Sequence, residues 1–554
     1  MRRMNIPKPL RIVQSRAFSN SLTVLLTCLI TVVQSQIPIN PSVPKALYLI
    51  ETEQPKKALA ELEQAVTSNP TDASLQYYLG YALLKAGDRA KALAAFEKGI
   101  QTNEKELLNY AGKGWISLLE NKVDDAKLQF EKAGGIKSKN PEVLKAIAEA
   151  YLIDNKYSVD AITVLNRAKS VANTDPEVQI LFGDAYLLQN QGGLSVTSYE
   201  RASGLRPTMA KAPYKVGLVY ERSKNNELAL ENFNKATTVD PKYSLAYKEL
   251  GEVYYLMNNA EKARKAYETY LSLTEKSQAP QTQVMWAFIL SLGKDYKKAN
   301  EVFKNIVNLP DVKVVTLRFY ANSLFEDGDF EKSKEIFELY FSKAKPQDVE
   351  AKDYSDYGKS LLKLKQDSLG IIAFNKSLSI NPDQQEILQL VGDTYYKNKK
   401  FAQAVEAYQK LIGKRKEPKS LDYFSIGRAY YYNNQFVQAD SAFTQLIKMQ
   451  PEMTVGYIWE ANTKSQMDTT SELGLAKPYF EKVIEKGSTN AEKNKKDLIS
   501  AYRYLGYFYY LKQDYTQAKA SYEKLLTFIP GDKQTMEALD ILNKPVPKQP
   551  QPKR

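Results

Sequence analysis

The sequence contains no histidine and a single cysteine, Cys28, among its 554 residues. Without these side chains the body of the protein lacks the means for a Cys/His zinc site, a Ser/His or Cys/His catalytic pair, or a disulfide framework. Phosphate and calcium loops are missing as well, because Gly134-Gly135 has no Lys-Ser/Thr partner and residues 326–329 lack the calcium-loop spacing. We therefore expect no metal, no cofactor and no enzyme. A hydrolase that uses carboxylates alone stays open as the less favoured alternative.

A long apolar run occurs near the start of the chain, at residues 22–33, where Cys28 lies. Basic residues without acids precede this run, and a small residue, Ser35, precedes Gln36. The pattern predicts a secretory signal peptide at residues 1–35 and a spacer at 36–44, and the run is too short to span a membrane comfortably. We expect an exported, periplasmic or envelope-associated protein with no transmembrane domain in the mature chain. An uncleaved N-terminal membrane anchor, an organelle transit peptide and lipidation at Cys28 remain alternatives.

The formal charge of +13 is concentrated at the two ends of the chain. Residues 1–35 carry five basic groups and no acid, and residues 544–554 carry four more. About 500 central residues keep only about +4, which is too dilute for a nucleic-acid-binding surface. No nucleic-acid partner is expected.

What the sequence does contain is a unit that recurs about every 34 residues. Its positions are Tyr247, Leu250, Gly251 and Tyr254 on one predicted helix, and Ala263 and Tyr267 on the next. The first four share one helical face, and the last two share a face on the second helix. Glycine and alanine let the two helices approach closely, while the tyrosine rings fill the space beside them. The unit is therefore an antiparallel helical hairpin.

This pattern resembles the tetratricopeptide (TPR) repeat, with tyrosine in place of the usual tryptophan and phenylalanine. The resemblance covers residues 45–531 and implies an all-α, right-handed α-solenoid of about 14 hairpins. Within it, residues 452–498 form an irregular unit with insertions. Residues 532–543 are expected to form a C-terminal capping helix, and residues 544–554 a disordered tail rich in proline and lysine.

Turns inside the hairpins carry Gly or Asn, the residues that most readily end a helix in the left-handed conformation. The pairs in question are Gly87-Asp88, Asn225-Asn226, Gly328-Asp329 and Asn433-Asn434. Each pair is expected to place its Gly or an Asn in that conformation.

Function must lie on the faces that packing leaves free. In TPR proteins, by resemblance, a second stripe on the first helix of each unit lines a concave groove that binds peptides. The stripe positions predicted here to bind a partner are Lys248, Glu252, Tyr255, Gln389, Asp393, Tyr396, Phe424, Arg428, Tyr431, Tyr432, Arg503, Tyr507 and Tyr510. Tyr and Arg are typical of interface hot spots, although the same rings could merely pack between neighbouring units.

The resemblance implies a non-catalytic scaffold that holds peptide segments or protein partners along the groove. A clamp for a partner's C-terminal carboxylate is disfavoured, because Asn occupies the Glu252 position only at Asn322 and Asn462, in non-adjacent units. A structural subunit of a large envelope or secretion assembly is the main alternative function.

Overall fold

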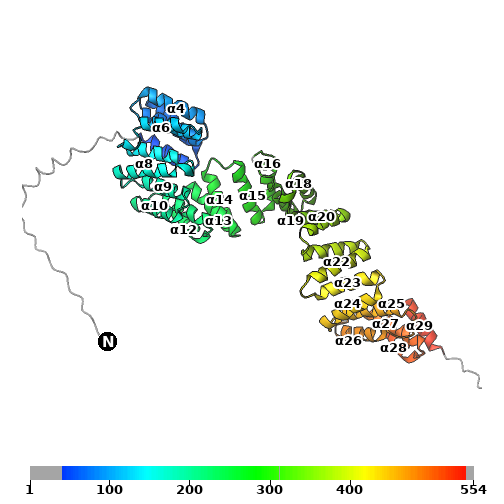
Figure 1. Ribbon diagram of the computed structural model, residues 1–554. Coiled ribbons are helices and arrows are strands. Elements are labelled where there is room, and N and C mark those ends of the chain that lie inside the picture. Colours follow the sequence, from blue (N-terminus) through cyan, green and yellow to red (C-terminus); the bar gives the residue numbers. More distant parts are fainter. Residues whose placement is uncertain (1–39, 311, 545–554) are drawn as a thin grey trace, which may run out of the picture. The chain divides into compact units, whose positions relative to one another are not determined.

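The computed structural model describes residues 40–310 and 312–544, and this part of the chain is helical with no strand (Figure 1). The predicted signal peptide, Cys28, residues 36–39 of the predicted spacer and residues 545–554 of the predicted tail lie outside it. None of the helices in the described ranges is both long enough and apolar enough to cross a membrane.

The chain divides into two compact units, residues 1–295 and 296–554. The helices of the first unit are α1 (Ser42–Glu51), α2 (Pro55–Ser68), α3 (Ala73–Lys85), α4 (Arg89–Thr102), α5 (Leu108–Leu119), α6 (Val123–Lys132), α7 (Pro141–Tyr151), α8 (Ser158–Val171), α9 (Pro176–Leu188), α10 (Gly192–Leu205), α11 (Lys211–Arg222), α12 (Asn226–Val239), α13 (Ser244–Leu256), α14 (Ala260–Leu273) and α15 (Pro280–Leu292). Short 3-10 turns lie at Gly135–Lys137 and Asn155–Tyr157.

The second unit begins with α16. Its helices are α16 (Tyr296–Ile306), α17 (Thr316–Asp327), α18 (Phe330–Lys343), α19 (Ala351–Lys363), α20 (Asp367–Ile380), α21 (Gln385–Lys397), α22 (Phe401–Lys414), α23 (Ser420–Tyr432), α24 (Phe436–Met449), α25 (Thr454–Met467), α26 (Lys477–Gly487), α27 (Lys495–Leu511), α28 (Tyr515–Phe528) and α29 (Lys533–Asn543). Its 3-10 turns are Pro346–Asp348 and Ser488–Asn490.

Within each unit the helices follow one another as antiparallel pairs, which confirms the predicted all-α solenoid. The boundary between the two units falls between α15 and α16, inside the sequence of the eighth predicted hairpin. A single helix, α29, follows the last pair and packs on α28.

In the hairpins that carry a glycine at the small packing position, the close approach rests on one repeated contact between that glycine and an aromatic ring. A Cβ added to Gly251 would lie 2.8 Å from Tyr267 Cδ2, and Ala263 beside it is completely buried. The same contact joins Gly183 to Tyr199 and Gly427 to Phe443, with the ring always 16 residues after the glycine. The glycine is therefore needed because the ring of the second helix occupies the place of its side chain.

The turn prediction holds at three of its four sites. Gly87, Gly328 and Asn434 have φ of 91°, 89° and 58°. At Asn225-Asn226 the prediction is wrong, because the left-handed residue is Lys224, with φ of 61°. Asn225 instead caps α12, since its side chain accepts a hydrogen bond from the Leu228 backbone N–H. The left-handed residue is the one directly before the N-cap, as Gly87 is before Asp88 and Asn434 before Gln435.

The irregular unit contains an ordered connection between α25 and α26. The Asp468 carboxylate accepts backbone N–H bonds from Leu473, Gly474 and Leu475, at 3.3, 2.7 and 3.3 Å. These bonds fold the inserted residues around Asp468 and leave Leu473 76% exposed at the tip.

Candidate functional site

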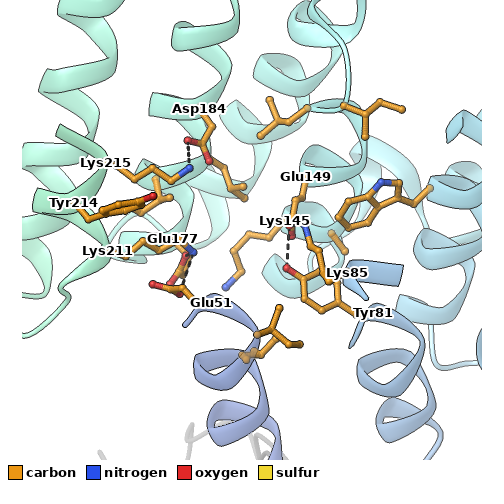
Figure 2. A pocket seen from close by; sticks show the side chains of 18 of the residues that line it. Glu51, Tyr81, Lys85, Lys145, Glu149, Glu177, Asp184, Lys211, Tyr214 and Lys215 are labelled. Carbon is orange, nitrogen blue, oxygen red and sulfur yellow. Dashed lines mark hydrogen bonds and ion pairs between the residues drawn. The ribbon is translucent and has the colours of Figure 1, made fainter. Parts of the chain in front are cut away.

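A cavity of about 800 Å³ lies in the first unit, among the first helices of its successive hairpins (Figure 2). Its wall takes residues from α1, α3, α5, α7, α9, α11 and α13. Leu47, Ile50 and Glu51 of α1 face residues such as Ile180, from a hairpin far along the chain. The first hairpin therefore completes the wall that the later hairpins form.

The wall is built from one stripe of the repeat, at the position directly after the small packing residue. Glu252 holds this position in α13, and the equivalent residues 34 or 35 places apart towards the N-terminus line the cavity. These residues are Leu218, Asp184, Glu149, Trp115 and Tyr81. The stripe position identified at Glu252 therefore marks the inner wall of this unit.

Most of the remaining wall is apolar or aromatic. Leucine and isoleucine side chains from α1, α5, α9, α11 and α13, and from the two residues that follow α7, supply the aliphatic surface. The rings of Tyr77, Tyr78, Tyr81, Trp115, Tyr214 and Tyr243 supply the aromatic surface. Such a lining is typical of sites that bury apolar groups of a ligand.

The charges of the wall balance, and its lysines and acids are paired with one another (Figure 2). The wall holds five acids and five bases. The ion pairs join Lys85 to Glu149 (2.9 Å), Lys145 to Glu142 (2.8 Å), Lys215 to Asp184 (2.9 Å), and Lys211 to both Glu177 (3.0 Å) and Glu51 (3.6 Å). The fifth base, Arg222, donates to the Asn190 side-chain oxygen at 2.7 Å.

For Glu149 and Lys211 the direction of the pKa shift favours the charged form despite burial. Burial works to raise the pKa of Glu149, but Lys85, Lys211 and the Tyr81 hydroxyl outweigh it and hold that pKa below its usual range. Burial works to lower the pKa of Lys211, but Glu51, Glu177 and Glu149 raise it overall. In residues 40–310 and 312–544 no group of acids or cysteine is arranged to hold a metal ion.

The predicted stripe residues of α13 lie next to this wall and are half-buried. Lys248 Nζ lies 3.7 Å from the Glu249 carboxylate and 3.9 Å from that of Glu252. Burial raises the pKa of Glu252; the charge of Lys248 works to lower it, and the charge of Glu53 adds to the increase. The Tyr255 ring stacks on Phe288 of α15, with ring centroids 6.4 Å apart.

In the second unit the structure brings five predicted residues into one aromatic cluster. Its centre is Arg428 of α23, whose guanidinium lies over the rings of Tyr396 (4.5 Å), Phe424 (5.1 Å) and Trp459 (5.5 Å). Arg428 Nη2 also donates to the Tyr396 hydroxyl at 2.6 Å. Cation–π contacts of this kind fix α21, α23 and α25 against one another.

Tyr431 and Tyr432 complete the cluster. Tyr431 meets Trp459 at 5.5 Å, and Tyr432 meets Phe401 at 5.2 Å and Tyr396 at 5.9 Å. Tyr432 keeps 46% of its surface exposed. Packing between neighbouring hairpins of the second unit therefore uses part of each predicted aromatic ring and leaves Tyr432 open to a partner.

The other predicted residues of the second unit make different contacts. Asp393 accepts from the Tyr408 hydroxyl at 2.6 Å and from Gln389 at 2.9 Å, which ties both predicted residues to their own hairpin. Arg503 pairs with Asp532 at 3.3 Å. Tyr507 and Tyr510 are 51% and 40% exposed on α27.

The sequence prediction missed the cavity wall of α3 to α11 and missed Trp459. The wall could have been found by carrying the Glu252 position back through each repeat. Trp459 carries a weaker signal, since it lies two residues before Ala461, at a position that is not part of the stripe.

Comparison with known proteins agrees with the helical hairpins. Two sequence models of the tetratricopeptide repeat match, one at residues 43–104 and 214–280 and the other at 385–413 and 501–532. Anaphase-promoting complex subunit 3 of Schizosaccharomyces pombe is 21% identical over 193 residues, which are 35% of this chain and 29% of that protein. Tetratricopeptide repeat protein 1 of the same yeast is 33% identical over 76 residues, 13% of this chain and 7% of that protein.

Among solved structures, the C-terminal part of a TPR repeat-containing protein from Cytophaga hutchinsonii is 29% identical. It covers 46% of this chain and 99% of its own, with a TM-score of 0.41. The matched residues of this chain span less than a third of the length of either yeast protein. The repeat matches in both units, together with the consecutive hairpins, show that the chain contains tetratricopeptide repeats.

Proposed function

We propose that the protein is a non-catalytic scaffold that binds peptide segments of partner proteins on the inner, first-helix faces of its repeats. The observation that supports this most directly is the cavity of the first unit. Its wall comes from successive first helices, and its volume of about 800 Å³ falls in the range of ligand sites.

The paired charges of the wall favour side chains without charge. A charged ligand group would have to compete with ion pairs such as Lys215–Asp184 and Lys211–Glu177. Separating a partly buried pair leaves an uncompensated charge, which is strongly unfavourable. An apolar ligand group that contacts the aliphatic and aromatic parts of the wall does not have to separate an ion pair. The ligand of the cavity is therefore a peptide segment with uncharged, apolar side chains.

The second unit supplies further contacts in this proposal. Tyr432, Tyr507 and Tyr510 present exposed rings at predicted stripe positions. Tyrosine provides a large contact area at a low cost in side-chain entropy, so these residues are suited to anchor a partner. The predicted groove residues that already bond within the array, such as Asp393, serve to hold the helices that present them.

Selection of displayed random peptides on the purified chain tests the proposed ligand. We expect enriched peptides to be rich in Leu, Ile and Phe and poor in charge. They should lose binding to Leu218→Glu, which places an unpaired charge in the cavity wall, and keep it for Leu194→Glu. Leu194 lies on α10, a second helix, and is 51% exposed. Enrichment of charged peptides, or equal binding to both variants, would rule the proposal out.

We also propose that the scaffold is exported and works in the cell envelope, on the strength of the sequence pattern at residues 1–35. Fractionation of cells, with N-terminal sequencing of the recovered protein, tests this. Recovery outside the cytoplasm with Gln36 as the first residue supports the proposal. Recovery in the cytoplasm with residues 1–35 intact contradicts it.

A further inference from the structure

The wall of the cavity is closed by a seam between the first hairpin and the seventh. The seam consists of residues 52–57, which follow α1, against residues 240–244 before α13 and residues 274–276 after α14. Its partners are about 190 to 220 residues apart in the sequence. The closure therefore results from the curvature of the array and not from local chain connection.

The tightest part of the seam is a reciprocal contact made by Glu275. Its backbone N–H donates to the Glu53 carbonyl oxygen at 3.1 Å. Its carboxylate accepts the backbone N–H groups of Lys56 and Lys57, at 2.8 and 3.3 Å. These belong to the first turn of α2, which has no side-chain cap of its own. Glu275 thus satisfies helix N–H groups that favour an anion.

Four further bonds surround this contact. They join the Tyr48 hydroxyl to Asp240 (2.8 Å), Ser244 Oγ to the Thr52 carbonyl (2.7 Å), and both the Tyr270 hydroxyl (2.7 Å) and Lys276 Nζ (2.8 Å) to the Glu53 carboxylate. Thr52 and Ser244 are completely buried. The seam is consequently a formed, specific contact.

The seam closes the first seven hairpins into a ring. The interactions at the seam differ from those between neighbouring hairpins in this ring. The apolar core of the first hairpin runs from Val43 to Ala82 of α3. A separate core joins Ala263, Tyr267 and Tyr270 of α14 to Ile289 of α15. Opening the seam exchanges hydrogen bonds for bonds to water, which has a small net cost, whereas parting stacked hairpins exposes apolar surface. The ring is therefore weakest at the seam.

We propose that the seam is a clasp, which opens to admit a ligand into the cavity and closes around it while the hairpins stay stacked. This inference rests on the proposed function of the cavity. Because α1 and α13 are the first and last helices of the cavity wall, the seam between them is the place where separation widens the entrance.

Hydrogen exchange on the full chain tests the clasp without any ligand. In Glu53→Ala/Glu275→Ala the amides of Lys56, Lys57 and Glu275 should exchange at least about tenfold faster, because charge-assisted bonds are lost. Tyr48→Phe, which removes one hydroxyl, should give a smaller increase at the same amides. Amides in α5, α7 and α9 should be unaffected in both variants.

The matched control is Glu231→Ala/Glu268→Ala. It removes two carboxylates from exposed pairs with Lys235 and Arg264 in the same unit. It should leave the seam amides as protected as in the wild type. Unchanged exchange in Glu53→Ala/Glu275→Ala, or equal acceleration across α5, α7 and α9, would overturn the clasp.

Gating is tested by the rate at which Nile red, an uncharged apolar dye, enters the cavity. Stopped-flow fluorescence should show entry at least about fivefold faster in Glu53→Ala/Glu275→Ala than in the wild type or the control. Equal rates in all three proteins would refute gating by the seam. Absence of dye binding to the wild type counts against the apolar cavity, and hydrogen exchange still decides whether the seam opens.

Discussion

Many of the hairpins contain a glycine that an aromatic ring of the second helix covers. Gly183 shows this most clearly, because a Cβ there would lie 2.3 Å from Tyr199 Cε1. The Tyr199 ring is fully buried, and its hydroxyl is held by Asp184 at 2.6 Å. The ring has little freedom to move away. Helix propensity and packing therefore make opposite predictions for alanine at this position.

Gly183→Ala should lower the free energy of unfolding by about 1–3 kcal/mol through overpacking, despite the roughly 1 kcal/mol by which alanine favours a helix. Gly204→Ala on α10 is the matched control, since no atom lies within 4 Å of the added Cβ. It should be neutral or stabilising. Urea denaturation of both variants measures the difference, and a stabilised Gly183→Ala would contradict the packing account.

Glu460 is a buried acid whose charge the fold disfavours. Burial and the neighbouring Asp440 raise the pKa of Glu460 to about 9, although Lys464 works in the opposite direction. The folded pKa lies above the unfolded value, so folding takes up a proton at neutral pH. This uptake destabilises the fold increasingly as the pH rises from about 4.5 towards 9.

Glu460→Gln should remove this pH dependence and keep the size of the side chain. We expect the variant to be more stable than the wild type by about 2 kcal/mol at pH 8, with the gap closing as the pH falls to 4.5. Unfolding midpoints across this range measure the effect. A gap that grows towards low pH would show that Glu460 is stabilised as the carboxylate.

At the scale of elements, the ordered connection after α25 depends on one side chain. Asp468→Ala removes the acceptor for three backbone N–H groups. The amides of Leu473 to Leu475 should then lose their protection from exchange, and cleavage by a protease near the exposed Leu473 should accelerate. Amides of α22 should not change. Retained protection at Leu473 to Leu475 would show that the connection is held by other contacts.

The hairpins could be predicted from the sequence because their contacts are local. Gly251 and Tyr267 are 16 residues apart, so one pattern of small and aromatic residues encodes both helices and their packing. The turn at Asn225 was less accessible. Asn225 is the N-cap of α12, so the left-handed residue is Lys224 before it, and the Asn-Asn pair does not reveal where α12 begins.

The candidate site could be predicted in part. The Glu252 position leads to Asp184 and Glu149 by counting repeats, because the array reuses one stripe. The pairing of Lys211 with Glu51 could not be derived in this way, since it joins the first and sixth hairpins across the ring. The length and curvature of the array bring them together, and no local pattern records that curvature. The predicted groove residues of the second unit stay predictions.

At the scale of the whole molecule, repetition lets one chain present two kinds of inner surface. The first unit encloses a cavity with paired charges, and the second presents the Arg428 cluster with exposed tyrosines beside it. Some stripe residues, such as Asp184 and Asp393, also hold the packing tyrosines. At an exposed stripe residue such as Tyr507, a substitution should alter affinity more than it alters folding.

The affinity of a selected apolar peptide for the full chain, measured from about 0.05 to 0.5 M salt, tests the central claim most directly. The wild type should bind with little dependence on salt, because the wall charges are already paired. Leu218→Trp, which places a larger side chain in the cavity wall, should bind at least about tenfold more weakly, whereas Leu194→Trp should bind as the wild type does. Affinity that falls steeply with salt, or that Leu218→Trp leaves unchanged, would contradict the claim that this cavity holds the ligand.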